Sequence, residues 1–415
     1  MQLAHFIQRY PPAMGGSEAY FARLGRWLVS RGHHVNVFTS SAIDLTAMWY
    51  PTGERLPADI TIDQGVTIHR FDPAFWPARR YMLKAMSLIP IALLQAVSLP
   101  CNPLAIRMLR AVRSTDIRYD AVHATAFPYA WPIVCAWHLA RRQRIPFLLT
   151  PFLHLGDPST ANDRTRKRYL ARPFRWLLSR ADAIFVQTPS EAEAVRAVGI
   201  PHDRIILQGL GVEPTECTGG NRERIRKLWG THENEIVVGH LANQSIEKGS
   251  VDLLQAVERA WARGSRVRLV LAGPIMPNFQ QFWERFTQRD RVIVMGVLSE
   301  DEKRDFFAGI DLFALPSRSD SFGLVLLEAW ANGLPNLAYR AGGIADVIRD
   351  SVDGRLVACG EIDALTNILT EWESNPMLRQ QLGEAGQSRI QTEFRWEDKL
   401  GIVESTLKRL HGSTR

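Results

Sequence analysis

The feature that most constrains the fold is the regular alternation of short apolar runs with amphipathic helical patterns along the whole chain. The apolar runs lack the polar–apolar alternation of a half-exposed strand, so they are typical of parallel strands covered on both faces. In the first half we predict strands at residues 3–7, 34–39, 66–70, 121–125, 147–150, 183–188 and 205–208. In the second half we predict them at residues 236–241, 267–272, 292–295, 312–315 and 336–338. This pattern predicts an α/β fold with doubly wound parallel sheets.

Helical patterns and one linker separate these strands. The predicted helices of the first half are residues 17–31, 79–99 and 103–113, with further helical stretches between the strands at 121–125, 147–150 and 183–188. Those of the second half are 250–263, 279–289, 299–308, 324–332, 344–349 and 362–373. Residues 209–220 are rich in Gly and Pro and lack periodicity, as expected of a linker. Because 415 residues exceed one ordinary domain, we predict two Rossmann-like domains, residues 1–212 and 213–392, and a C-terminal segment, 393–415.

Composition and charge narrow the class of protein only in part. A hydrophobic fraction of 46% is enough for two cores and excludes a disordered chain. The net charge of +7 suits phosphates, nucleic acid or acidic lipid without choosing among them, and it equally fits solubility alone. Four cysteines lie far apart without a CxxC pair, so we expect neither a disulfide nor a zinc framework, but a reducing, cytoplasmic compartment.

Targeting and membrane signals are weak. Residues 1–12 lack a basic segment followed by an apolar one, so we expect no signal peptide. The most apolar stretch, residues 88–99, is shorter than the ~20 residues that span a bilayer, and Pro90 and Gln95 interrupt it. A membrane-spanning helix is excluded here, whereas a helix lying at the membrane interface is not.

Two loops, each between a predicted strand and a helix, carry residues suited to binding an anion. In residues 10–18, Gly15 and Gly16 let the backbone approach a ligand, the helix start offers N–H groups, and Ser17 is a candidate N-cap. Lys248, followed by Gly249, places a cation beside another helix start, where it can neutralise a diphosphate. Without a ligand, the two glycines of residues 10–18 fit a tight turn, and Lys248-Gly249 fits a solvated turn.

A third loop combines two carboxylates. Asp320 lies in the polar loop after residues 312–315, and Glu328 follows eight positions later on the next helix. Carboxylates at such positions are suited to accepting hydrogen bonds from ribose or sugar hydroxyls. The alternative is an acidic residue at a helix N-terminus and a partly exposed Glu. Strand, loop and helix start align, which favours a site.

Taken in order, these motifs resemble a known family. The chain is similar to GT-B glycosyltransferases of the large retaining family 4, also called glycosyl transferases group 1, which includes bacterial mannosyl- and glucosyltransferases acting on lipids and polysaccharides. The matching segments are the Pro-Pro-x-x-Gly-Gly loop at 11–16, Thr150 to His154, Gly211-Val212-Glu213, Glu247-Lys248-Gly249, Asp320-x7-Glu328, Gly333-Leu334-Pro335, Ala341-Gly342-Gly343 and Asp353-Gly354. The resemblance implies two Rossmann-like domains facing a cleft, with the C-terminal helix near 395–410 packing back on the first.

The resemblance also implies an activity and a set of catalytic residues. The activity is retaining transfer of a sugar from a nucleotide-diphosphate donor (a UDP-, GDP- or ADP-sugar), without a metal or any other cofactor. It implies that Lys248 stabilises the leaving diphosphate and that Glu328 holds the ribose hydroxyls. Asp320 would bind donor-sugar hydroxyls, and His154 would lie near the sugar and the acceptor. The further donor-binding residues that it implies are Gly15, Gly16, Asn243, Gly273, Leu298, Ser321, Phe322, Gly323 and Leu324.

Three departures from the family pattern stand out. The carboxylate motif opens with Asp320, one methylene shorter than the usual Glu, and Ser321 replaces a frequent Gly. Five residues before Lys248, Asn243 stands where the family has an Arg, and an amide supplies neither the charge nor the fork of a guanidinium. Either another cation, His240 or Arg318, replaces it, or turnover is weak.

The acceptor belongs to the first domain by the same resemblance. A dense basic region that includes Arg166 and Arg168, together with the apolar residues 88–99, is suited to an anionic, membrane-borne acceptor. His123 would also point toward the cleft, although such a histidine is often structural. We therefore expect a carbohydrate or lipid-linked acceptor, peripheral contact with the inner face of the membrane, and a role in envelope or polysaccharide biosynthesis. A solvated basic face beside a buried helix remains the alternative.

Three other functions compete with this hypothesis. A nucleotide-sugar epimerase shares the fold but not the ordered set of motifs. A glycosyltransferase-like protein that binds nucleotide sugars but has weak or no catalysis would explain Asn243. Nucleic-acid binding is suggested only by the Arg-rich region and lacks an accompanying aromatic motif, so we do not expect it.

Overall fold

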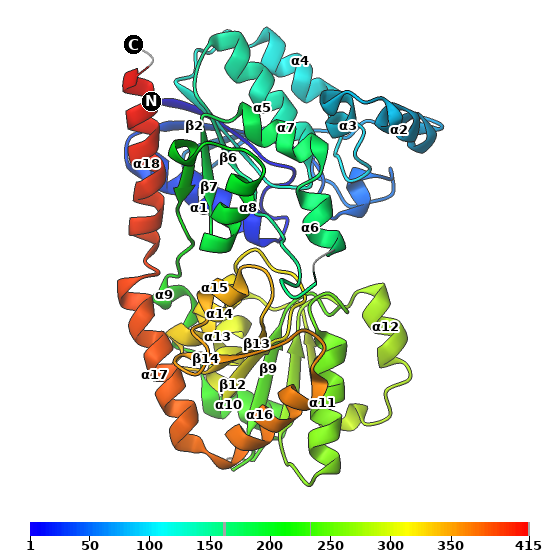
Figure 1. Ribbon diagram of the computed structural model, residues 1–415, viewed down its shortest axis with the longest axis vertical. Helices are drawn as coiled ribbons and strands as arrows, with labels where there is room; N and C mark the ends of the chain where they lie inside the picture. The colour runs from blue at the N-terminus through cyan, green and yellow to red at the C-terminus, as the bar shows by residue number, and fades with distance from the viewer. Residues whose placement is uncertain (161–162, 233, 414–415) are drawn as a thin grey trace. The chain divides into compact units, whose positions relative to one another are not determined.

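The computed structural model describes residues 1–160, 163–232 and 234–413. The chain forms two compact units, and each consists of a sheet covered by helices on both faces (Figure 1). Unit 1 comprises Met1–Leu153, Arg166–Gln208 and Leu400–Arg415, and unit 2 comprises His154–Thr165 and Gly209–Lys399. The prediction of an α/β fold with two parallel sheets is confirmed.

The sheet of unit 1 has the strand order β3-β4-β2-β1-β5-β6-β7-β8 among the described residues. All neighbouring strands are parallel except β3 and β4, which are antiparallel. The strands are β1 (Gln2–Phe6), β2 (His34–Ser40), β3 (Ile60–Asp63), β4 (Val66–Phe71), β5 (Ala121–Thr125), β6 (Phe147–Thr150), β7 (Ala183–Val186) and β8 (Ile205–Leu207). The helices are α1 (Gly16–Ser30), α2 (Arg79–Leu88), α3 (Ala92–Val97), α4 (Ile106–Ser114), α5 (Ala130–Gln143), α6 (Arg164–Tyr169), α7 (Arg172–Arg180), α8 (Pro189–Ala197) and, from Leu400 on, α18 (Trp396–Ser413).

The sheet of unit 2 is parallel throughout its described strands, in the order β11-β10-β9-β12-β13-β14. Its strands are β9 (Val237–Leu241), β10 (Arg268–Ala272), β11 (Val292–Gly296), β12 (Leu312–Leu315), β13 (Asn336–Tyr339) and β14 (Gly354–Val357). Its helices are α9 (Pro214–Cys217), α10 (Arg222–Trp229), α11 (Ser250–Ala262), α12 (Pro277–Trp283), α13 (Glu300–Gly309), α14 (Leu324–Ala331), α15 (Ile344–Val347), α16 (Ile362–Ser374) and α17 (Pro376–Thr392).

Burial explains why the apolar runs read as continuous rather than alternating. Every residue of β5, β6, β7, β12 and β13 is buried, because helices cover both faces of each sheet. The core of unit 2 joins Val238 and Leu312 of the sheet to Leu253 and Trp372 of the helices. These rigid sheets position the loops at their carboxyl ends, where ligands of such folds bind.

Some predicted elements were wrong in extent. The helix predicted at 79–99 is two helices, because Ile89 is extended (ψ 126°) and Pro90 cannot continue the helical hydrogen bonding. Strands β3 and β14 and helices α9, α10 and α17 were missed. Strand β3 is a short antiparallel edge with exposed isoleucines, β14 contains a Gly and an Arg, and α17 has little amphipathic character.

Candidate active site

The loops after β9 and β12 bring together two charged groups of unit 2 that the resemblance assigns to the donor. Because β9 and β12 are parallel neighbours, the segments that follow them emerge at the same edge of the sheet. Lys248 Nζ lies 2.6 Å from Asp320 Oδ2, although the residues are 72 positions apart. Both side chains are partly exposed, so this ion pair is available to a ligand.

The backbone around Gly249 sets the position of Lys248. Gly249 has a left-handed conformation (φ 76°), and a Cβ there would lie 1.9 Å from the carbonyl oxygen of Pro316. Only glycine fits this contact between the loop and the end of β12. Helix α11 begins directly afterwards, at Ser250, and the N–H of Lys248 donates to Ser245 Oγ (3.1 Å). The lysine therefore stands at a helix N-terminus, a favourable place for an anion.

Asp320 is held by several independent contacts. Its Oδ1 accepts hydrogen bonds from the N–H groups of Phe322 (3.3 Å) and Gly323 (3.1 Å). Burial opposes ionisation, but Lys248 and these hydrogen bonds outweigh it and hold the pKa of the Asp320 carboxyl below its ordinary value. Gly342 (φ 52°) packs against the backbone here, since a Cβ on it would lie 2.2 Å from the Asp320 carbonyl oxygen.

His154 belongs to unit 2 and lies beside the same loop. Its Nδ1 is 3.4 Å from Ser319 Oγ, and the carbonyl of Gly156 accepts a hydrogen bond from Gly342 N (2.8 Å). Burial, with a smaller contribution from Lys248, lowers the pKa of His154 to about 4 despite the opposing effect of Asp320. The imidazole is therefore neutral at physiological pH and adds no charge to the ion pair.

Glu328 lies on α14 and has a partner that the sequence pattern did not reveal. Lys303 Nζ on α13 is 3.0 Å from Glu328 Oε1 and also 3.0 Å from Glu300 Oε2. Burial raises the pKa of the Glu328 carboxyl above its ordinary value, and Lys303 opposes that rise. Lys303 was missed because a lysine on an acidic, amphipathic helix is usually an exposed surface residue, and no motif distinguishes it.

The structure contradicts one of the two suggested replacements for the missing arginine. Asn243 is exposed in the segment after β9. His240 is fully buried, its ring hydrogen-bonds Ala314 O (2.8 Å) and Ser250 Oγ (2.9 Å), and burial lowers its pKa to about 4. It cannot supply a cation, so that suggestion was wrong. Arg318 remains the candidate replacement for the arginine, although its Nη2 lies 2.5 Å from Asp252 Oδ2.

The other predicted donor-binding residues of unit 2 lie at the carboxyl edge of the sheet. Gly273 (φ 114°) follows β10, where a Cβ would lie 2.0 Å from the Ala242 carbonyl oxygen, and Leu298 follows β11. Phe322 is buried against Phe394 (ring centroids 6.2 Å apart), so only its backbone faces the loop. Ser321 and Leu324 are partly exposed at the start of α14.

The glycine loop of unit 1 contains a carboxylate that the sequence pattern did not single out. Gly15 precedes α1, and a Cβ on it would lie 2.3 Å from Glu18 Oε2. Glu18 is buried in the first turn, where Arg9 Nη2 lies 2.7 Å from its Oε1. Ser17 was wrongly expected as the N-cap, because α1 starts one residue earlier and the Ser17 hydroxyl donates to Glu18 (2.7 Å). Gly16 has open space around it.

The expected acceptor residues of unit 1 lie in different surroundings. His123 is 1% exposed, its Nε2 lies 2.8 Å from Thr150 Oγ1, and its ring packs edge-on against Phe21. Its expected contact with an acceptor was therefore wrong, because β5 is covered on both faces and the ring points into the core. Arg166 and Arg168 are exposed on the short helix α6.

The described residues contain neither a group of side chains that could hold a metal ion nor a helix that could cross a membrane. In residues 1–160, 163–232 and 234–413, no three or more His, Cys, Asp or Glu side chains form a group that could hold a metal ion. Within the same ranges, no helix has both the length and the apolar character needed to cross a bilayer.

Comparison with protein-family models covers both units. Residues 15–211 match the model "Glycosyl transferase 4-like domain", and residues 221–389 match "Glycosyl transferases group 1". Together, the two matches include most of the chain.

Named relatives and solved structures agree with these matches. The chain is 28% identical over 368 residues to the 2-deoxystreptamine N-acetyl-D-glucosaminyltransferase of Streptomyces fradiae, covering 85% of this chain and 81% of that one. It is 25% identical over 390 residues to the N-acetyl-alpha-D-glucosaminyl L-malate synthase of Bacillus anthracis, covering 93% and 92%.

Among structures, Anabaena HepE in complex with UDP and glucose has a TM-score of 0.73 at 19% identity, covering 99% of this chain and 100% of HepE. The sucrose-phosphate synthase of Thermosynechococcus elongatus has a TM-score of 0.77 at 20% identity, covering 99% of each chain. The fold is the two-domain GT-B fold, and this chain, a glycosyltransferase, belongs to the glycosyl transferases group 1.

Proposed function

We propose that the protein transfers a hexosyl group from a nucleotide-diphosphate sugar to a carbohydrate or lipid-linked acceptor, with retention and without a metal ion or other cofactor. The observation that carries this proposal is the Lys248–Asp320 pair, held beside the N-termini of α11 and α14 at the carboxyl edge of the sheet. That arrangement offers one cation and two sets of backbone donors to a diphosphate.

Departure of the nucleoside diphosphate builds negative charge on the oxygen that leaves the anomeric carbon. Lys248, fixed by its loop, can stabilise that charge without moving, and the first-turn N–H groups of a helix lack intrahelical partners. Such groups accelerate the reaction because they interact more strongly with the transition state than with the intact donor. In this proposal they do the work that a divalent cation does elsewhere.

The carboxylates hold the two ends of the donor. Glu328 accepts the ribose hydroxyl hydrogen bonds, with Lys303 favouring its ionised form. Asp320 accepts from the hydroxyls of the transferred sugar, and the neutral His154 lies on the side of the sugar and acceptor. Because Lys248 and two N–H groups already engage Asp320, retention in this proposal does not rely on that carboxylate as a nucleophile.

In this proposal, residues near Gly273 and Leu298 select the nucleotide base of the donor. Gly15 and Gly16 contribute backbone N–H groups. UDP-sugars are the first donors to test. Anabaena HepE has been solved with UDP and with UDP-glucose, which supports that order of testing. A thermal-shift screen of UDP-, GDP- and ADP-sugars would identify the base.

Substitution of Lys248 and Glu328 tests the proposal. We expect Lys248→Ala and Glu328→Ala each to reduce sugar transfer by about a hundredfold or more, the scale of losing one preorganised electrostatic group. Lys227→Ala, at an exposed position on α10, is the matched control and should transfer at the unaltered rate. Circular dichroism and thermal unfolding establish that the variants fold, and full activity in both active-site variants would refute the proposal.

Chelation tests whether transfer is independent of a metal ion, and product analysis tests whether the anomeric configuration is retained. Transfer should continue unchanged in excess EDTA, and NMR of the product should give the same anomeric configuration as the donor. Loss of activity on chelation, restored by Mg²⁺ or Mn²⁺, would contradict metal independence. An inverted product would contradict retention.

Asn243 favours a second candidate, a glycosyltransferase-like protein that binds nucleotide sugars with little turnover. Neither Asn243 nor the neutral His240 supplies the cation that the family has at this place. Slow hydrolysis of a bound donor separates the candidates, because an enzyme releases free sugar and a binding protein does not.

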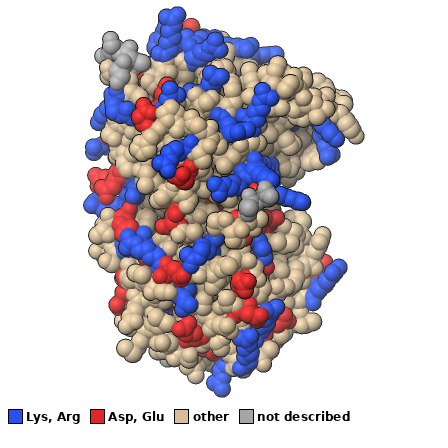
Figure 2. Space-filling model, viewed as in Figure 1, with Lys and Arg blue, Asp and Glu red and all other residues tan. Residues whose placement is uncertain are grey.

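We also propose that the protein works in the cytoplasm at the inner face of the membrane, in envelope or polysaccharide biosynthesis. Lys and Arg gather on the visible face of unit 1 with few carboxylates among them (Figure 2). Four cysteines that lie far apart in the sequence without a CxxC pair support a reducing compartment. Co-sedimentation with vesicles that contain acidic lipid, compared with neutral vesicles, tests the membrane contact.

A further inference from the structure

Unit 1 contains a large cavity whose lining includes Arg168 and part of the apolar residues 88–99. Its volume is about 1000 Å³, at the upper end of small-molecule sites. Its walls come from residues 49–51 after β2, residues 75–81, 83, 84 and 87 after β4, residues 95 and 98–101, and Arg168 after β6. Because β2, β4 and β6 are parallel members of one sheet, the cavity lies at the carboxyl edge where ligands of this fold bind.

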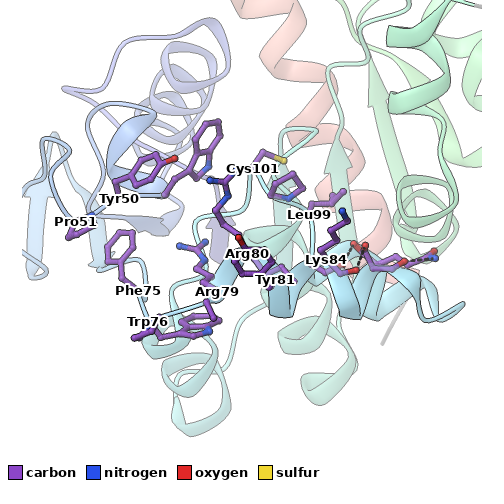
Figure 3. A pocket seen from close by; sticks show the side chains of 18 of the residues that line it. Tyr50, Pro51, Phe75, Trp76, Arg79, Arg80, Tyr81, Lys84, Leu99 and Cys101 are labelled. Atoms are coloured by element: carbon purple, nitrogen blue, oxygen red, sulfur yellow. Dashed lines mark hydrogen bonds between the residues drawn. The ribbon is translucent and has the colours of Figure 1, made fainter.

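The walls are mainly aromatic and aliphatic. Figure 3 shows Tyr50, Phe75 and Trp76 on one side of the cavity and Leu99 and Cys101 on the other. Several of these rings remain accessible, and Trp49 and Tyr50 are 43% and 47% exposed. Aromatic walls of this size are suited to an extended apolar group rather than to a sugar ring alone.

All the charged residues of the lining are cations. They are Arg79, Arg80, Lys84 and Arg168. The sequence from residue 73 to residue 115, which carries three of these cations, contains no Asp or Glu. Arg79 is committed to the fold, because its guanidinium donates to the carbonyls of Met48, Ala74 and Asn102. Arg80, Lys84 and Arg168 are exposed.

One cation of the lining, Arg168, lies near the glycine loop, whereas Arg79, Arg80 and Lys84 lie on α2. Arg168 hydrogen-bonds the thiol of Cys101, whose Sγ contacts the Pro128 carbonyl, and it acts electrostatically on Tyr129 together with Arg9 and Glu18. Arg168 is therefore close to the loops that follow β1 and β5.

At the other end, α2 and α3 project as the outermost helices of unit 1 (Figure 1). Their tip exposes apolar side chains, with Tyr81 at 78%, Leu88 at 77% and Ile91 at 53%.

We propose that this cavity binds one molecule of an anionic amphiphile as the acceptor. Its apolar chain would lie along Trp76 and Leu99 toward the α2–α3 tip, and its phosphate would lie at Arg168. The inference rests on the proposed function. A hydroxyl of the amphiphile's headgroup forms the new bond to the anomeric carbon of the sugar, the bond from that carbon to the diphosphate breaks, and the hydroxyl proton leaves with the diphosphate.

Calorimetric titration with geranyl phosphate, a water-soluble isoprenoid phosphate, tests the site directly. We expect saturable one-to-one binding, with geraniol and inorganic phosphate each binding at least tenfold more weakly, because each offers only half of the interaction. Arg168→Gln and Trp76→Ala should each weaken the binding of geranyl phosphate about tenfold. Arg107→Gln on α4 and Trp137→Ala on α5, which lie outside the cavity lining, are the matched controls and should bind normally.

A parallel measurement of donor hydrolysis keeps this inference separate from the proposed function. If the protein hydrolyses a nucleotide sugar but does not bind geranyl phosphate, the cavity proposal is overturned and the glycosyltransferase proposal stands. If geranyl phosphate binds but no donor is turned over, the cavity binds the amphiphile but the proposed function fails. Binding to acidic vesicles without binding to monomeric geranyl phosphate would show a membrane-docking surface instead, and would also overturn the cavity proposal.

Discussion

Lys303 and Glu328 are a pair in which one side chain sets the protonation state of the other. Burial raises the pKa of Glu328 and Lys303 lowers it. We expect Lys303→Met to remove the opposing effect, so that Glu328 is protonated at higher pH and the acid limb of donor binding moves to higher pH. At the acid end, affinity should fall about tenfold, the value of one charged hydrogen bond.

The pH dependence of the donor Kd, measured by calorimetry for the wild type and the variant, checks this prediction. Lys303→Arg keeps the charge and should keep the wild-type profile. Superimposable profiles for Lys303→Met and the wild type would show that Lys303 does not control Glu328.

His5 makes the stability of the folded protein depend on pH. It is 1% exposed on β1, neither of its ring nitrogens has a hydrogen-bond partner among the described residues, and burial lowers its pKa to about 3. Below pH 6.5 the unfolded chain binds a proton at this histidine that the folded protein excludes. Stability is therefore complete above pH 6.5 and falls toward pH 3, by up to ~1.4 kcal/mol per pH unit.

The variant His5→Leu should flatten this acid dependence, with a gain relative to the wild type of about 2 kcal/mol at pH 5. Thermal unfolding from pH 4.5 to 8 measures it. His34→Gln, at an exposed position of β2, should leave the slope unchanged. His123 is buried beside His5, with ring centroids 5.6 Å apart, and keeps part of the slope in the variant. An unchanged slope in His5→Leu would contradict the prediction.

At the scale of one element, helix α11 has a left-handed glycine at each end. Gly249 (φ 76°) precedes the helix and Gly264 (φ 90°) follows it. A Cβ at Gly264 meets nothing within 4 Å, whereas one at Gly249 meets the carbonyl of Pro316 at 1.9 Å. Substitution by alanine at Gly264 therefore tests the left-handed backbone conformation alone. At Gly249 it tests this conformation together with a steric clash.

We expect Gly264→Ala to cost about 1 kcal/mol of unfolding free energy, the cost of a left-handed alanine. Gly249→Ala should cost about 2–3 kcal/mol or more and should also weaken donor binding, because the loop that carries Lys248 has to move. Urea unfolding and donor titration provide the two measurements. Equal stability and affinity in the two variants would show that the Pro316 contact does not position Lys248.

At the scale of the whole molecule, the C-terminal helix returns the chain to unit 1. From Leu400 onward α18 belongs to that unit, and Leu400, Val403 and Leu407 are all at most 1% exposed. Glu404 adds a contact between its Oε1 and His33 Nε2 at 3.1 Å. The end of the sequence thus helps to complete the core formed by its beginning.

Deletion of residues 400–415 should destabilise unit 1 and leave unit 2 folded. Each buried apolar side chain that is lost removes about 1.5–3 kcal/mol. Hydrogen exchange should therefore speed up in β1 and β2 and stay slow in β9 and β10. The substitution Lys408→Gln, on the same helix, is a mild control because its side chain is largely exposed. Equal acceleration of exchange in both sheets would contradict this assignment of α18.

Local patterns in the sequence were sufficient for the sheets and for the order of the loops. Uninterrupted apolar runs such as those of β5 and β12 predict buried parallel strands, because burial on both faces removes the alternation. A Lys-Gly pair and an Asp-x7-Glu spacing follow two such strands, and the structure shows that Lys248 and Asp320 form an ion pair. A short polar strand such as β14 leaves no comparable pattern.

Only the tertiary structure decided which partners the charged groups have and which surfaces they line. Lys303 reaches Glu328 from another helix, His240 loses its charge through burial, and His123 points into the core. The cavity of unit 1 joins residues from 49 to 168, which no local pattern connects. Strand and helix patterns depend on neighbours in the chain, whereas desolvation, ion pairing and cavity shape depend on residues distant in sequence that packing alone brings together.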